Sequence, residues 1–154
     1  MSNSLFDAIR NEEPTTVEIL LEQNPKWVEA KDQRGSTPLL LATYYGMEEI
    51  SQLILNYPQD IDAQDASGNT ALMGVCFKGY QSLAELLIEH KANVNVTNYN
   101  GATALIFAAT FDNLEIVKFL LANGADPNIM DDRGNRAVDH AKMQGISPIV
   151  ELLS

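Results

Sequence analysis

Apolar residues recur along this chain three and four positions apart, a spacing that places them on one face of a short helix. The clearest runs are Leu83, Leu86 and Leu87, and Ile116, Val117, Leu120 and Leu121. Polar segments that contain glycine separate such runs. The pattern predicts a series of short helices joined by tight turns, and the apolar face of each helix must pack against a neighbour.

The polar segments repeat with a fixed period. Their glycines are Gly35, Gly68, Gly101 and Gly134, each 33 residues after the last. An Asp or Asn lies three residues before each of them. Glycine adopts a positive φ without steric cost, and Asp and Asn side chains hydrogen-bond to nearby backbone groups. We therefore expect a tight turn at each of these four points.

Each turn is followed by the signals of a helix. Threonines suited to N-capping stand at Thr37, Thr70 and Thr103. Residues suited to the left-handed position after a helix follow at Gly46, Gly79, Gly145 and the pair Asp112-Asn113. A second run of apolar residues comes after each of these. Because one unit of this length cannot bury two helices alone, the units must stack, and the sequence predicts an all-α solenoid.

The repeating unit resembles the ankyrin repeat, which has the same period. The likeness is greatest where Asn-Gly-Ala-Thr-Ala-Leu begins at Asn100 and Leu-Glu-Ile-Val-Lys-Phe-Leu-Leu begins at Leu114. The resemblance implies a single all-α domain over residues 1–154, built of helix-turn-helix units joined by β-hairpin-like turns. Its five repeats are expected at about 1–31 (N-terminal cap), 32–64, 65–97, 98–130 and 131–154 (C-terminal cap).

Departures from the family pattern are few. The family's histidine after Thr-Pro-Leu is replaced here by Leu40, Met73, Ile106 and Asp139. We expect the three apolar replacements to be buried between repeats and the hydrogen bonds of the histidine to be missing. The loop that begins at Asn24 is one residue longer than its counterparts, and Lys91 stands where Gly124 ends a helix in the next unit.

The formal net charge of −11 narrows the choice of partner. The ten basic residues are scattered from Arg10 to Lys142 without a run, so neither nucleic acid nor an anionic membrane surface is an expected partner. The acidity has two readings. It keeps the molecules soluble and mutually repelling, which favours a monomer, or it steers a basic partner protein to the surface.

Cysteine content and the N-terminal residues bear on location. Cys76 is the one cysteine, so no intramolecular disulfide can form, and no basic segment followed by an apolar stretch opens the chain at Met1. No apolar run is long enough to span a bilayer. We expect a cytoplasmic location.

Proteins similar to this one bind partners on a concave face, which the turn tips and the exposed side of each first helix form. Carrying that pattern over gives these candidate protein-binding residues: Arg34, Tyr44, Tyr45, Phe77, Lys78, Tyr99, Thr110, Phe111, Arg133 and Met143. Aromatic residues make up only 7% of the chain, yet they fill half of this set. Interfaces favour such residues. Alternatively, some of the rings pack between successive first helices.

Catalytic and metal-binding patterns are absent from the sequence. Cys76 lies inside a first helix where the next unit has Ala109, so it is expected to be a small core residue, and His90 and His140 lie on other helices. The acidic segment from Asp60 to Gly68 lacks the register of a calcium loop. We expect no catalytic residue, no cofactor and no metal.

The expected function is therefore a non-catalytic module that recognises a partner protein on its concave face, in the manner of an adaptor or an inhibitor. One alternative is a self-associating or purely structural solenoid, which sedimentation at several concentrations would separate. A small-ligand-binding protein or an enzyme would instead require a deep pocket with convergent polar groups.

Overall fold

The computed structural model describes residues 2–154, which form ten α-helices and one 3₁₀ helix, η1. The elements are α1 Asn3–Arg10, α2 Pro14–Gln23, η1 Pro25–Glu29, α3 Pro38–Tyr44, α4 Glu48–Leu55, α5 Ala71–Lys78, α6 Gln81–Glu89, α7 Ala104–Thr110, α8 Leu114–Ala122, α9 Ala137–Gln144 and α10 Ser147–Leu153. No strand occurs within this range. The helices follow one another as five antiparallel pairs, in agreement with the all-α prediction.

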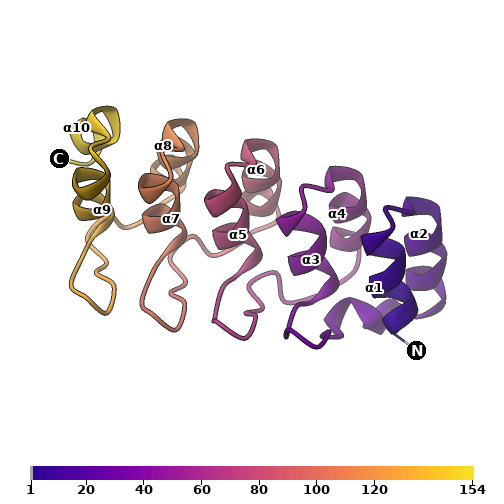
Figure 1. Cartoon of the computed structure of the whole chain (residues 1–154). Helices are drawn as coiled ribbons and strands as arrows, with labels where there is room; N and C mark the ends of the chain where they lie inside the picture. The colour runs from indigo at the N-terminus through magenta and orange to yellow at the C-terminus, as the bar shows by residue number, and fades with distance from the viewer. Residues whose placement is uncertain (1) are drawn as a thin grey trace.

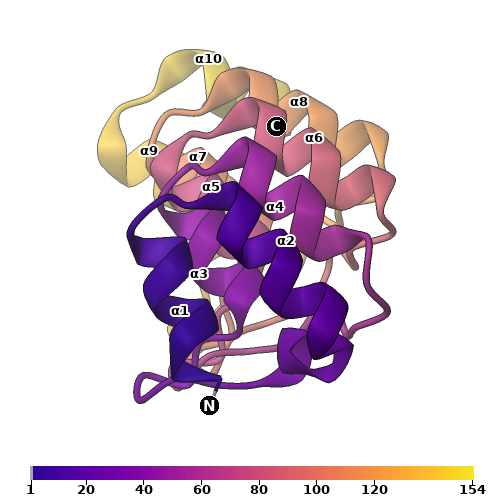
Figure 2. The ribbon, with the colours of Figure 1, turned by 90° about the vertical axis from the view of Figure 1, so that its right-hand side faces the viewer.

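The pairs stack side by side into a two-layered solenoid (Figure 1). The first helices α1, α3, α5, α7 and α9 form one layer, and the second helices α2, α4, α6, α8 and α10 form the other (Figure 2). Each helix packs on its partner within the pair, and each first helix packs on the first helix of the next pair. The loops that precede α3, α5, α7 and α9 project from one edge of the stack as a row of hairpin-like turns.

The turns are held by the predicted acidic and amide side chains. Oδ1 of Asp32 accepts hydrogen bonds from the backbone N–H groups of Arg34 and Ser36, both at 2.9 Å. The backbone N–H of Asp32 donates to the carbonyl oxygen of Ser36 at 2.9 Å. Equivalent bonds form at Asp65, Asn98 and Asp131. The repeated turn is therefore a local structure that each unit makes for itself.

The predicted helix caps are confirmed. The Thr37 hydroxyl accepts the N–H of Leu40 at 3.2 Å, and the hydroxyls of Thr70 and Thr103 do the same three residues on. The left-handed ends are also present, at Gly46, Gly79, Gly145 and Asp112. Lys91 adopts the same conformation with φ of 73°, although it is not glycine.

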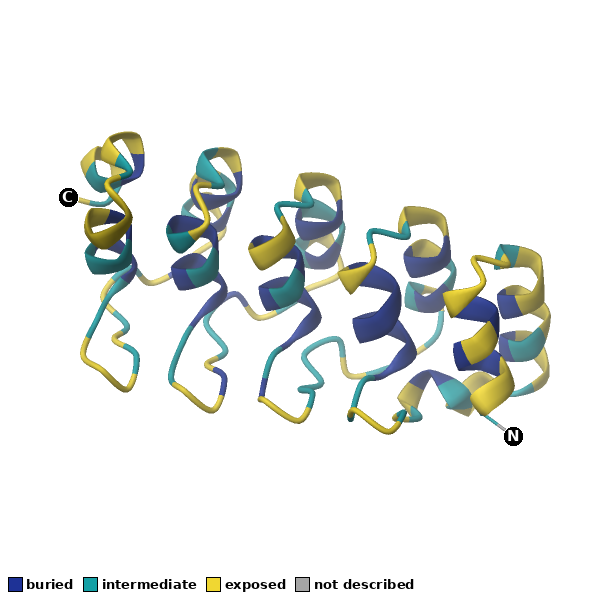
Figure 3. Cartoon of the chain, in the orientation of Figure 1, coloured by how far each residue is buried: buried dark blue, intermediate teal, exposed yellow. Residues whose placement is uncertain are grey.

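The core runs the length of the stack between the two layers (Figure 3). Leu40, Met73 and Ile106 are buried between repeats, as expected from their place in the family pattern. Part of the missing histidine bonding is supplied by other groups, since the Met73 sulfur accepts the N–H of Thr70 at 3.4 Å. Leu5, Phe6 and Leu21 are buried as well, so the first pair belongs to the same core.

The loop after α2 differs from the simple insertion that the sequence suggested. It folds as η1, with Pro25 in the first turn and Val28 buried. Trp27 packs against the core from the same segment. The extra residue is therefore taken up by a turn of 3₁₀ helix that covers the edge of the core between the first two pairs.

Candidate functional site

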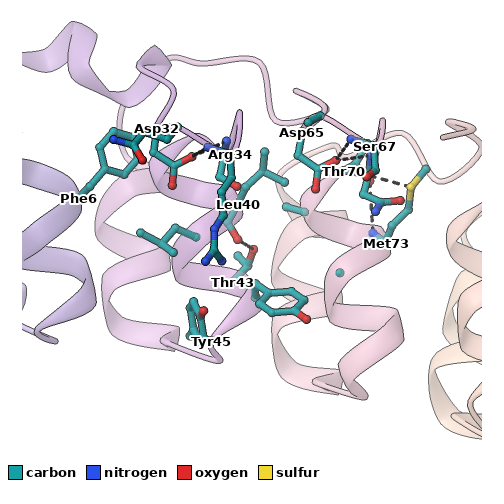
Figure 4. Close-up of a pocket in the computed structure, with 18 of the residues that line it drawn as sticks. Phe6, Asp32, Arg34, Leu40, Thr43, Tyr45, Asp65, Ser67, Thr70 and Met73 are labelled. Carbon is teal, nitrogen blue, oxygen red and sulfur yellow. Dashed lines mark hydrogen bonds between the residues drawn. The ribbon is translucent and has the colours of Figure 1, made fainter. Parts of the chain in front are cut away.

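The face shared by the first helices and the hairpin-like turns, here called the concave face, contains a groove of about 1220 Å³ over the first three pairs (Figure 4). Residues of α1, α3 and α5, the turns before α3 and α5, and Phe107 of α7 line it. Its apolar lining includes Leu40, Leu41, Met73, Gly74 and Phe107. The groove is long and open because it follows the stack, and it offers a broad surface to a ligand.

Five aromatic rings from α3, α5 and α7 and from the residues that follow α3 and α7, here called the aromatic cluster, form two groups: Tyr44 with Tyr45, and Phe77 with Phe107 and Phe111. Tyr44 and Tyr45 meet edge to face with 5.5 Å between ring centroids. Phe77 lies between the two other rings, 4.7 Å from Phe111 and 6.4 Å from Phe107. Such contacts hold the rings in place and leave their outer faces open.

The exposed fractions and ring contacts bear on both readings of these rings. Tyr44, Tyr45, Phe77 and Phe111 have 40%, 52%, 41% and 48% of their surface exposed, whereas Phe107 is half-buried. These four rings keep part of their surface exposed, and Phe77 also packs on Phe107 and Phe111 of the next pair, as the alternative reading expects. Large exposed aromatic patches are unusual on a monomeric protein unless they contact something.

Two charged side chains extend the cluster and the groove. The Lys78 ammonium lies 4.8 Å from the centroid of the Tyr44 ring, within the range of a cation–π contact. At the other end Arg10 pairs with Asp32, at 3.2 Å between Nη2 and Oδ2, and with Asp7, at 3.6 Å between Nη1 and Oδ1. Charges of both signs thus flank the apolar part of the groove.

Comparison with known families agrees with this architecture. A family model described as ankyrin repeats (3 copies) matches residues 39–131 and 94–154, which is well over half of the chain. The chain belongs to the ankyrin-repeat family. Ankyrin repeats are generally protein–protein interaction modules and are typically non-catalytic. A search of curated proteins found no match to the chain.

The ten predicted binding residues fall into two groups, those that line the groove and those that do not. Arg34, Tyr44, Tyr45 and Phe77 line the groove. The others lie outside its lining: Lys78, Tyr99, Thr110, Phe111, Arg133 and Met143. Lys78 and Phe111 adjoin the groove through their contacts with Tyr44 and Phe77.

The remaining four lie farther along the ankyrin stack. Tyr99 is exposed at a turn tip, where its N–H donates to the carbonyl oxygen of Ser67 at 3.2 Å. The Thr110 hydroxyl donates to the carbonyl oxygen of Ile106 at 2.7 Å, inside its own helix. Arg133 and Met143 are exposed on the last pair.

Several groove residues were not predicted from the sequence. Asp7 and Arg10 come from α1, which the family comparison of exposed positions did not cover. Leu41, Gly74 and Phe107 occupy one position in three successive first helices. Only their alignment at the 33-residue period could have indicated that they lie in a row, and their different sizes carry no local signal.

The reactive side chains outside the groove, Cys76 and His140, are buried or paired. Cys76 is fully buried in α5, and burial raises the pKa of its thiol. Nε2 of His140 lies 2.7 Å from Oδ2 of Asp131. Within residues 2–154, no group of three or more His, Cys, Asp and Glu side chains is placed to hold a metal ion. The same range has no helix of the length and hydropathy that crossing a membrane requires.

Proposed function

We propose that this ankyrin-repeat chain is a non-catalytic binding module that holds a partner protein on its concave face, as an adaptor or an inhibitor. The aromatic cluster is the observation that carries the proposal. Its exposed rings border a groove on a face that the fold leaves uncovered. Aromatic side chains of this kind commonly dominate the binding energy of protein interfaces, because they bury a large area at a modest entropic cost.

Charge supports a basic partner. The chain carries 21 acidic and 10 basic residues, so a cationic protein approaches it down a favourable potential. The same self-repulsion supports a monomer. A free cysteine, here Cys76, is usual in a reducing compartment, and we place the protein in the cytoplasm on that ground.

The test is a pull-down from a lysate of the native cells with a tagged parent chain and a fourfold variant, Tyr44→Ala, Tyr45→Ala, Phe77→Ala and Phe111→Ala. All four side chains are exposed, so we expect the variant to keep its helical circular dichroism. The proposal expects at least one protein to be recovered with the parent and lost with the folded variant.

A matched control keeps the result specific to this face. Ile19→Ala and Leu152→Ala remove exposed apolar side chains from α2 and α10 in the other layer, and this double variant should recover the same protein as the parent. Equal recovery by the fourfold variant would contradict the proposal. Sedimentation of the parent at several concentrations tests self-association, because a concentration-dependent dimer that the fourfold variant abolishes would assign the cluster to a second copy.

A further inference from the structure

Gly74 is unlike the other glycines of this chain. Eight of the nine glycines have positive φ, which explains why they are glycine. Gly74 is the exception, and it lies in the middle of α5. Glycine weakens a helix interior relative to alanine, since it loses more backbone entropy on folding and covers nothing.

Packing does not require glycine at this position either. A Cβ built on Gly74 meets one side-chain atom of another residue, Cδ1 of Tyr44, at 3.5 Å, which is an ordinary contact distance. By contrast, a Cβ at Gly68 or Gly79 would lie 2.7 Å or 2.8 Å from a neighbouring residue. Neither backbone conformation nor close approach therefore accounts for Gly74.

The neighbouring pairs show what Gly74 leaves open. The equivalent position holds Leu41 in α3 and Phe107 in α7, and both side chains line the groove. Gly74 is half-exposed between them, with Tyr44 and Phe77 beside it. We call this space the Gly74 hollow. The Tyr44 ring borders it, with Cδ1 3.5 Å from a Cβ built on Gly74, and no other atom outside the neighbouring part of α5 lies within 4 Å of that Cβ, so the space opens into the groove.

The aspartates that open the repeat turns differ in whether a cationic side chain pairs with them. Asp32 and Asp131 have their second carboxylate oxygen paired, with Arg10 and His140 respectively. Asp65 occupies the equivalent place in the third unit and lines the groove, yet no cationic group in residues 2–154 lies within 4.0 Å of its carboxylate. Figure 4 shows Asp65 on the α5 side of the groove and Arg34 on the α3 side. The Asp65 carboxylate can therefore accept a cationic side chain of another protein.

We propose that the Gly74 hollow receives one bulky apolar side chain from an extended segment of a basic partner protein, with a Lys or Arg of that segment bound by Asp65. This inference rests on the proposed function and specifies its ligand. The apolar anchor fills the space between Leu41 and Phe107, and the aromatic cluster covers it.

The probe is a random dodecapeptide library displayed on phage and selected on the parent chain, followed by fluorescence anisotropy with the enriched peptides. We expect enrichment of a large apolar residue, Leu, Met or Phe, with Lys or Arg a few positions away. Gly74→Leu fills the hollow with the side chain that Leu41 already has in the preceding helix, and it should weaken binding at least tenfold. Gly74→Ala should have a smaller effect.

Control variants test whether a loss of binding comes from filling the hollow or from a disturbed fold. Ser82→Leu adds the same bulk to the exposed surface of α6 and should bind as the parent does. Asp65→Asn keeps the turn, because Asn98 makes the same backbone bonds in the next unit, and it should weaken binding and reduce its salt dependence. Replacing the apolar anchor of the peptide by Ala should weaken binding to the parent but not to Gly74→Leu. Thermal melts establish that each variant is folded.

The outcomes distinguish this inference from the proposed function. If Gly74→Leu binds the peptides as tightly as the parent while the fourfold aromatic variant does not, the hollow is not a binding pocket, and the concave face is still the binding surface. If the fourfold variant also binds normally, both proposals are wrong. A selection that enriches no peptide would overturn recognition of an extended segment, and the pull-down would then test a folded partner.

Discussion

Replacing Gly74 by alanine should stabilise this protein. The residue lies inside α5, and exchanging glycine for alanine in a helix interior contributes about 1 kcal/mol. The added methyl group meets Tyr44 at an ordinary van der Waals distance of 3.5 Å, so no steric term opposes this gain. In a chain of this size, that difference corresponds to a rise in Tm of about 2–4 °C.

Replacing Gly79, just after the end of α5, by alanine should instead lower the stability of the protein. Gly79 follows α5 with φ of 80°, and an L-residue in that conformation costs about 1–2 kcal/mol. A Cβ there would lie 2.8 Å from Oδ1 of Asn113, whose Nδ2 donates to the carbonyl oxygen of Cys76 at 2.7 Å. Disturbing that bond adds about 1 kcal/mol. Gly79→Ala should therefore destabilise the protein by about 2 kcal/mol or more.

Urea denaturation followed by circular dichroism at 222 nm measures both differences against the parent. Repeat proteins can unfold in more than one step, so the comparison requires a single transition with an unchanged slope in all three proteins. A loss of stability in Gly74→Ala would refute the reasoning, because it would show that glycine has a packing role in α5. Stabilisation by Gly79→Ala would refute the account of the left-handed helix end.

Three other outcomes follow from buried polar groups. Ser51 is fully buried, and its hydroxyl has no hydrogen-bond partner within residues 2–154. Ser51→Ala should therefore raise the free energy of unfolding, measured in urea, by about 1 kcal/mol. A lower free energy of unfolding would contradict this. Burial opposes ionisation of Asp131, but hydrogen bonds from the Asn135 N–H and the His140 ring hold its pKa below the ordinary value. Its folded-state pKa is then below the unfolded one, so its charge contributes stability above about pH 4 that is lost as the pH falls through the folded pKa. Asp131→Asn should flatten the decline in stability between about pH 5 and 3, and an unchanged profile would contradict this. Cys76 should react with a disulfide reagent only after unfolding, and a rapid reaction under native conditions would show that α5 is not packed as described.

The repeating turns and helix ends could be predicted because their signals are local. Asp32 bonds to backbone groups two and four residues on, and Thr37 bonds to the N–H three residues on. Such contacts need nothing from the rest of the chain. The spacing of 33 residues then predicted the stack, since it shows that every unit presents the same unsatisfied apolar faces to its neighbours.

The shape of the site could not be predicted in the same way. The Phe107 ring of α7 contacts the Phe77 ring of α5, thirty positions away in the sequence, and no local pattern indicates that contact. The pairing of His140 with Asp131 likewise joins a helix to a turn nine residues away. The sequence did indicate that Tyr44, Tyr45 and Phe77 share a face, because their position in the repeat is the same or adjacent.

In a stacked repeat, residues one period apart become neighbours, so a single repeat position runs along the whole groove. Here that position holds Leu41, Gly74, Phe107 and His140 in successive first helices. The surroundings of these four residues differ: Leu41 is buried in the core, Gly74 and Phe107 are half-buried at the groove, and the His140 ring pairs with Asp131. Stability and recognition are thus set at different positions of the same helix. Met73, Val75 and Cys76 are buried and hold α5 in the stack, whereas position 74 can be glycine, with a loss of helix stability and a gain of space for a ligand.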